Sequence, residues 1–139
     1  MQDNINVYMN VISRFCRLQM NLKRDLPIRA SEMGVLIYIQ KNKEQSTPIM
    51  ISNFFGIAKP SVTDIINSLV KKNYLIKIKS EIDRRSYILE ITTKGYELLE
   101  NTYEEYFRTI EILQNKMGNK EFKLFIKLLK EANTILSEE

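Results

Sequence analysis

A pattern centred on Gly56 constrains the fold of this chain more than any other feature. A helix-turn-helix needs a small residue in its first helix, a glycine at the turn, and apolar residues at fixed offsets that lock the two helices at a steep angle. Ser52 supplies the small residue four positions before Gly56. The apolar offsets are occupied by Ile51, Phe55, Ile57, Val62 and Ile65. The pattern therefore predicts two short helices packed across a tight turn.

Hydrophobic periodicity surrounds this motif with further helices and one β-hairpin. The hairpin is predicted from two β-type runs, 75–79 and 87–91, that flank a charged tip at 81–85. The predicted helices span residues 3–24, 31–41, 48–55, 59–72, 93–117 and 119–136. The fold class is therefore mainly α with a small β-hairpin wing, an α+β arrangement, because a helix-turn-helix followed by a charged hairpin is the layout of a winged helix.

Capping residues set the expected helix boundaries. Gly56 is expected to end the first helix of the motif, and Asn73 to end the second in a left-handed conformation. The residues expected as N-caps are Ser31, Thr47, Thr92 and Asn119. The helix over 31–41 is expected to pack through one face, formed by Met33, Leu36, Ile37 and Gln40.

Composition excludes most catalytic chemistry. The 139 residues contain no histidine, which excludes imidazole bases, Ser-His and Cys-His nucleophiles, and zinc sites that need a histidine ligand. The sequence also has neither a phosphate-binding glycine loop nor an acid–base constellation. We therefore expect a binding protein with no catalytic residues, no metal and no cofactor.

Cysteine usage and apolar run lengths indicate the compartment. The one cysteine cannot form an intrachain disulfide, and the N-terminus has no secretion-signal pattern. The longest apolar runs fall far short of the ~20 residues that a membrane helix requires. A cytoplasmic protein with no membrane partner is expected.

The positive charge is unevenly distributed along the chain. The formal net charge is +4. Residues 58–94 carry eight Lys or Arg against four Asp or Glu, whereas residues 95–139 carry six against nine. An uneven field of this kind suits a protein that presents one face to a polyanion.

The helix predicted over 59–72 has a polar face suited to a DNA groove. Its apolar side chains fall on one side at 100° per residue. The opposite side carries Pro60, Thr63, Asp64, Asn67, Ser68 and Lys71. A major groove about 12 Å wide admits such a helix, and Thr, Asn and Asp side chains can read base edges there.

The segment that follows resembles a known wing signature. Residues 83–95 read D-R-R-S-Y-I-L-E-I-T-T-K-G, which resembles the pattern D-x-R, three residues, L-x-[LI]-T-x-x-G of the MarR family of transcription regulators. The resemblance also covers residues 56–73 and the element order of essentially the whole chain. It implies a single domain over 1–139, with a winged helix-turn-helix at about 31–94 and dimerisation helices at about 1–24 and 95–139.

The resemblance also implies specific DNA contacts. Arg85 at the wing tip would enter the minor groove, whose negative potential attracts arginine, while Asp83 would hold its guanidinium. Lys72 is a further phosphate candidate. The candidate DNA-binding residues are Lys59, Ser61, Thr63, Asp64, Asn67, Lys71, Asp83, Arg84 and Arg85. Two residues depart from the family. Asp64 stands where a basic residue is frequent, and Ala58 stands where a Ser or Thr N-cap is common.

Apolar stripes on the terminal helices predict a homodimer. A seam along 99–117, a stripe along 122–136 and a second stripe on the first helix exceed what one small winged helix can bury. MarR-like proteins form two-fold dimers through such helices, and a dimer of this kind binds a pseudo-palindromic operator. The resemblance therefore implies a DNA-binding regulator, and our leading hypothesis is a repressor that a small ligand or an oxidant releases. The alternatives are a folded-back monomer, and a winged-helix module that binds protein instead of DNA, for which Asp64 is the best support.

Cys16 has two interpretations. It continues an apolar stripe of the first helix, which favours a buried structural thiol. Some MarR-like regulators carry one peroxide-sensing cysteine on that helix, which makes Cys16 a candidate redox sensor.

Overall fold

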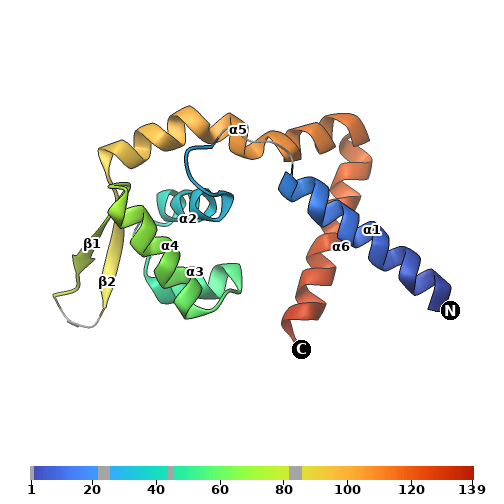
Figure 1. Cartoon of the computed structure of the whole chain (residues 1–139), viewed down its shortest axis with the longest axis horizontal. Coiled ribbons are helices and arrows are strands. Elements are labelled where there is room, and N and C mark those ends of the chain that lie inside the picture. The colour runs from blue at the N-terminus through green and yellow to red at the C-terminus, as the bar shows by residue number, and fades with distance from the viewer. Residues whose placement is uncertain (1, 22–25, 44–45, 82–85) are drawn as a thin grey trace.

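The computed structural model describes residues 2–21, 26–43, 46–81 and 86–139. Within them the chain is mainly helical, with one antiparallel hairpin, as predicted. The long helix α5 runs along one side of the molecule, with the hairpin and α2–α4 under one end and α1 and α6 at the other (Figure 1). The elements are α1 (Gln2–Asn21), α2 (Ala30–Lys41), α3 (Pro48–Phe55), α4 (Lys59–Lys71), β1 (Leu75–Lys79), β2 (Tyr87–Ile91), α5 (Thr93–Met117) and α6 (Asn119–Ser137).

Helix α2 is the centre of the core. It packs against α4, α5 and β2, and a helix surrounded in this way must be apolar on more than one side. The one-sided packing expected for it is therefore wrong, since Val35 and Ile39 are as fully buried as Met33 and Leu36. The core continues through Ile51, Val62, Ile66, Leu69, Leu75 and Leu89.

The helix-turn-helix has the predicted turn. Gly56 adopts φ 64° and ends α3, and Asn73 adopts φ 66° after α4. Ile51, Val62 and Ile65 are buried between the helices as expected. Phe55 is not: its side chain is 39% exposed and packs on its neighbours Tyr38 and Phe54 instead.

Two of the four expected N-caps are confirmed. Thr47 Oγ1 accepts from the Met50 N–H at 3.3 Å, and Thr92 Oγ1 accepts from the Gly95 N–H at 3.0 Å. Ser31 and Asn119 are already inside their helices, so these two predictions are wrong. At α2, the Glu32 carboxylate caps the helix by accepting from the Arg29 N–H.

The hairpin is regular where the structure describes it. β1 and β2 pair from Leu75–Ile91 to Lys79–Tyr87. Leu75 and Leu89 are buried on the side that faces the core, and the Leu89 N–H donates to the Ser46 carbonyl at 2.9 Å. Residues 82–85 of the expected tip at 81–85, and residues 22–24 at the expected end of the first helix, lie outside the described residues.

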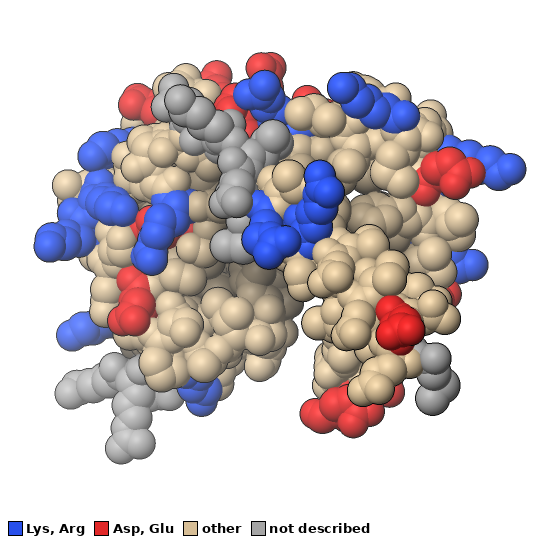
Figure 2. Space-filling model, turned by 45° about the vertical axis from the view of Figure 1, so that its right-hand side comes forward, with Lys and Arg blue, Asp and Glu red and all other residues tan. Residues whose placement is uncertain are grey.

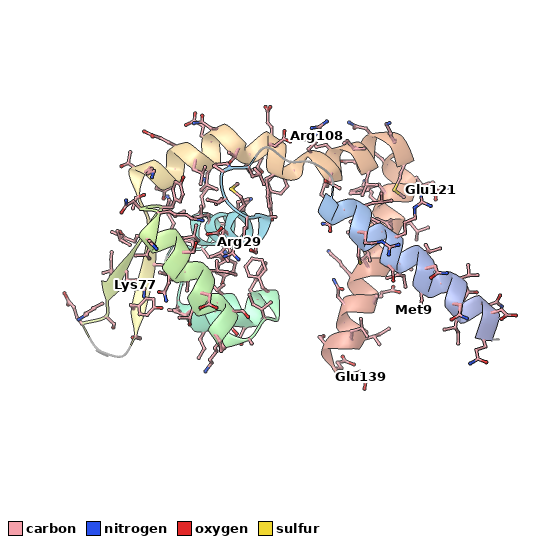
Figure 3. The ribbon with its side chains drawn as sticks, in the orientation of Figure 1. Met9, Arg29, Lys77, Arg108, Glu121 and Glu139 are labelled. Carbon is pink, nitrogen blue, oxygen red and sulfur yellow. The ribbon has the colours of Figure 1, made fainter. Side chains whose placement is uncertain are left out.

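The terminal helices expose most of their apolar side chains. α1 touches α6 through an edge-on contact of Phe15 with Phe125, whose ring centres are 5.7 Å apart. Met9 on α1 stands 55% exposed (Figure 3). Other exposed apolar side chains on these two helices are Ile5, Val7, Tyr8, Val11, Ile12, Phe15, Leu18, Leu124, Leu128, Leu129, Ile135 and Leu136. No helix in the described part of the chain has the length and apolar character to cross a membrane.

Candidate nucleic-acid interface

The polar face of α4 that is predicted to contact DNA, here called the reading face, is exposed. Val62, Ile66 and Leu69 bind this helix to the core. The side chains left in solvent include Lys59, Ser61, Thr63, Asp64, Asn67 and Lys71, which are the six α4 residues predicted to contact DNA. The fold therefore presents them together, and their contacts with DNA stay a prediction.

The first turn of α4 is open to an anion. The N-cap Ala58 gives no side-chain hydrogen bond to the first N–H groups, as its sequence predicts. Thr63 Oγ1 donates back to the Lys59 carbonyl at 3.0 Å. Exposed N–H groups at a helix N-terminus attract phosphate through both hydrogen bonding and the helix dipole. This end of α4 can thus hold a DNA phosphate beside the Lys59 ammonium.

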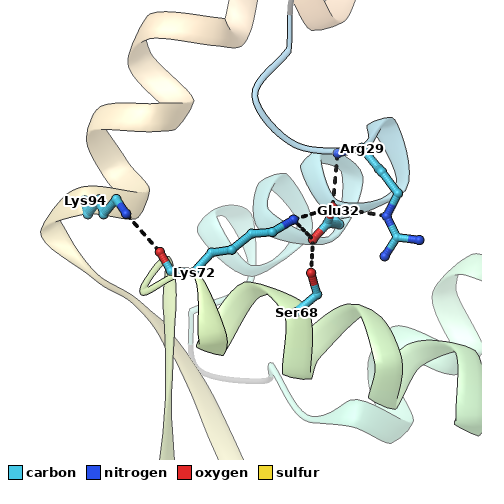
Figure 4. A network of polar contacts seen from close by, with 5 residues as sticks. All are labelled: Arg29, Glu32, Ser68, Lys72 and Lys94. Carbon is cyan, nitrogen blue, oxygen red and sulfur yellow. Dashed lines mark hydrogen bonds and ion pairs between the residues drawn. The ribbon is translucent and has the colours of Figure 1, made fainter.

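Ser68, which was predicted to face solvent, and Lys72, a phosphate candidate, both contact a buried carboxylate. Ser68 Oγ donates to Glu32 Oε2 at 2.7 Å, and Lys72 Nζ lies 3.2 Å from the same oxygen (Figure 4). Arg29 Nε donates to Glu32 Oε1 at 3.2 Å from the other side. Ser68 and the C-cap residue Lys72 therefore join the C-terminal end of α4 to α2. The Lys72 side chain is still 44% exposed, so its contact with a phosphate stays a prediction.

Glu32 is a buried carboxylate with its full set of donors. Its side chain has 0% exposure. Burial alone would raise its pKa, but the hydrogen bonds from Ser68, Arg29 and Lys72 outweigh burial and lower the pKa from 4.5 to about 2. Sequence analysis missed this residue. The position of Glu32 could have revealed it. A Glu three residues after the N-cap, here Arg29, can accept a hydrogen bond from the N-cap N–H and so cap the helix.

Lys77 was also missed, and it contacts the reading face directly. Its Nζ donates to Asn67 Oδ1 at 3.0 Å and lies 5.0 Å from the centre of the Tyr87 ring. The alternation of β1 could have found it, because Lys77 shares a strand face with the buried Leu75.

A cavity of about 490 Å³ lies between the starts of α3, α4 and β2. It adjoins the reading face, because Lys59 and Thr63 belong to both. The other lining residues are Thr47, Pro48, Ile49, Ser86 and Tyr87.

The predicted wing contacts cannot be placed. Asp83, Arg84 and Arg85 lie outside the described residues, so their roles stay predictions. The two strands that flank these residues are described, and β1 packs against α4. On the face shown in Figure 2, Lys and Arg side chains gather on the half that carries the helix-turn-helix and the hairpin.

Cys16 is exposed in the single chain. The interpretation as a buried structural thiol stays a prediction, because Cys16 belongs to the stripe of α1 that a partner chain is expected to cover. Its role as a redox sensor stays a prediction. Among the described residues, no group of three His, Cys, Asp or Glu side chains is placed to hold a metal ion.

A helix-turn-helix with an exposed polar second helix and an adjoining hairpin is a winged helix of the MarR-like fold. The sequence profile of the family described as transcriptional regulator SarA/Rot matches residues 17–102. The chain belongs to this SarA/Rot family, which is one of transcriptional regulators and not of enzymes.

One curated relative and two solved structures are similar to this chain. The HTH-type transcriptional regulator BilQ of Clostridioides difficile is 29% identical over 107 residues, which cover 75% of this chain and 72% of BilQ. The crystal structure of S. aureus MepR with DNA matches with a TM-score of 0.81 at 17% identity, covering 95% of this chain and 97% of that one. The PcaV regulator of Streptomyces coelicolor, solved with its natural ligand, matches with a TM-score of 0.76 at 14% identity over 91% and 89% of the two chains. At these identities the two structures establish the fold alone.

Proposed function

We propose that this chain is a sequence-specific regulator that binds a pseudo-palindromic operator as a homodimer. The observation that carries the proposal is the row of exposed polar side chains on α4 beside the hairpin. A helix with such a face fits the major groove, and the hairpin then lies against the neighbouring minor groove. The winged helix-turn-helix at about 31–94 would supply these contacts, and the segments at about 1–24 and 95–139 would pair the two copies.

The proposed contacts divide by chemistry. Ser61, Thr63, Asp64 and Asn67 present hydroxyl, carboxylate and amide groups to base edges, and Asp64 can accept from a cytosine amine. Lys59 and Lys71 neutralise phosphates. At the wing, Arg85 enters the minor groove with Asp83 holding its guanidinium, and Arg84 adds positive charge.

The exposed apolar faces of α1 and α6 support the homodimer. Val11 is 64% exposed, Leu128 53% and Leu136 72%. Burying one such side chain fully contributes about 1.5–3 kcal/mol, so a chain that leaves these two faces in water gains much by pairing. A two-fold pair places its two α4 helices about 34 Å apart, one turn of DNA.

The proposed regulation is repression that a small ligand or an oxidant relieves. The structural similarity to PcaV, which was solved with its natural ligand, supports a small-molecule effector. The exposure of Cys16 leaves its thiol accessible to an oxidant. Since the BilQ relative is bacterial and a bacterial chromosome lies in the cytoplasm, we expect the protein to act there.

The salt dependence of DNA binding tests this proposal. Genome-wide footprinting first supplies the bound sites, and fluorescence anisotropy then measures the affinity for one of them. If six phosphates are neutralised, the affinity falls about 10³-fold between 50 and 200 mM salt. Arg85→Ala should remove much of the binding, whereas Lys130→Ala on the exposed side of α6 should not. A folded protein with a flat salt profile would refute the proposal and favour a winged-helix module that binds protein.

A further inference from the structure

Lys77 occupies the side of the hairpin that faces the core. It is the cross-strand partner of Leu89, and both Leu75 and Leu89 on this side are buried. Because strand side chains alternate between faces, Lys77 extends from the hairpin toward α4, beside which it is drawn in Figure 3. A lysine on this inner face is unusual, since a solvent-seeking ammonium is normally placed on the outer one.

Two contacts hold the Lys77 ammonium in place. Its Nζ donates to Asn67 Oδ1 at 3.0 Å, and it lies 5.0 Å from the centre of the Tyr87 ring, within the range of a cation–π contact. One partner belongs to the helix expected to read the major groove, and the other to the second strand of the hairpin. Lys77 thus connects the two elements that the proposed function places on DNA.

We propose that Lys77 is a positioning residue that determines which bases Asn67 reads, an inference that rests on the proposed function. An ammonium group only donates hydrogen bonds. The oxygen of the Asn67 amide must therefore face Lys77, and the Nδ2 group is turned away from it. The orientation of an amide that would otherwise rotate freely is fixed before DNA arrives.

This orientation selects among bases. An asparagine recognises adenine by accepting from the N6 amine through Oδ1 while donating to N7 through Nδ2. With Oδ1 turned to Lys77, Asn67 keeps only its donor for the groove. That donor matches N7 and O6 of guanine, O4 of thymine and N7 of adenine. Asn67 therefore loses the second hydrogen bond, to N6, by which an asparagine favours adenine over the other bases.

Selection from randomised DNA sites tests this assignment. The wild-type protein and Lys77→Met, which keeps an unbranched apolar stem without the ammonium, are compared for base preference in the operator. We expect the wild type to show no preference for A over G or T at the position read by Asn67. In Lys77→Met the freed amide should raise the relative affinity for A at that position by about tenfold, the worth of one bidentate contact.

Three control variants separate positioning from charge. In an Asn67→Ala background, Lys77→Met should leave the base preference unchanged, because the group being positioned is gone. Lys79→Met removes the same charge two residues further along β1 and should lower the affinity equally for all sites. Lys77→Arg keeps a donor toward Asn67 and should restore the wild-type preference. Circular dichroism checks that each variant is folded.

Two results would overturn the assignment. If Lys77→Met lowers the affinity by one factor for every site and reduces the salt slope by about 0.9, Lys77 contacts a phosphate and positions nothing. If wild-type protein binds all DNA sequences equally or none at all, the proposed function itself fails, and the assignment of Lys77 fails with it. The first result leaves the proposed function intact, so the two failures are distinguishable.

Discussion

Replacing Glu32 with glutamine should cost the fold much of its stability at neutral pH. Glu32→Gln keeps the shape of the side chain but removes the charge that faces Lys72 and Arg29. The lost attraction is to two groups that are partly exposed, with side-chain exposures of 44% for Lys72 and 66% for Arg29, so water can rehydrate them. The main cost is therefore the loss of the ionised acceptor itself, which sits buried among hydrogen-bond donors.

The lowered pKa gives the size of this cost. The pKa falls from 4.5 to about 2 on folding, and each pKa unit corresponds to about 1.4 kcal/mol. The ionised form of Glu32 is thus favoured in the folded chain by about 3 kcal/mol over its neutral form. Because the folded pKa is the lower one, this stabilisation is complete above about pH 5 and is lost as the pH falls toward 2.

Urea unfolding at two pH values measures the effect. At pH 7 Glu32→Gln should lower the free energy of unfolding by about 3 kcal/mol, and at pH 3 the gap to wild type should shrink to about 1.5 kcal/mol. Glu100→Gln, which removes an exposed carboxylate from α5, should change neither value. Protein concentration must be held constant, because pairing of chains adds to the apparent stability. A gap that is equal at both pH values would refute the reasoning.

Three further variants test the packing of the fold and the roles of the terminal helices. Gly95→Ala should lower the free energy of unfolding by about 1–3 kcal/mol, because an added Cβ would lie 2.5 Å from the Tyr74 carbonyl oxygen; a melting temperature equal to that of wild type would contradict this. Leu128→Asp should convert a two-chain species into single chains in analytical ultracentrifugation, since it places a charge on the exposed apolar face of α6; wild-type protein that sediments as one chain would refute the homodimer. Cys16→Ser should leave operator affinity within about twofold of wild type, because Cys16 lies on α1 and away from α4; loss of binding by this variant under reducing conditions would contradict that separation.

The features predicted correctly from the sequence are those set by local chemistry. The turn at Gly56, the left-handed Asn73 and the caps at Thr47 and Thr92 each depend on a few neighbouring residues. The helical spacing of apolar residues was sufficient to predict the buried side of α4. Such features follow from backbone preference and periodicity, which a sequence displays directly.

The features that were missed join residues far apart in the chain. Periodicity assigned Ser68 to solvent, and the family resemblance made Lys72 a phosphate candidate. Glu32 lies opposite both, 36 and 40 positions earlier. Lys77 meets Asn67 only because the hairpin folds back along α4. Tertiary packing decides such contacts, and a polar side chain with a distant partner looks the same in sequence as one that faces water.

The length of α5 has a mechanical consequence. Its 25 residues span about 37 Å at 1.5 Å per residue. α1 and α6 lie at one end of this helix, and α2–α4 with the hairpin lie at the other (Figure 1). Over that span a tilt of about 5° moves the far end by about 3 Å, close to the rise of one base pair. A rigid helix of this length therefore couples the two ends of the molecule geometrically, so that a small tilt at the terminal helices displaces α4 and the hairpin by several ångströms.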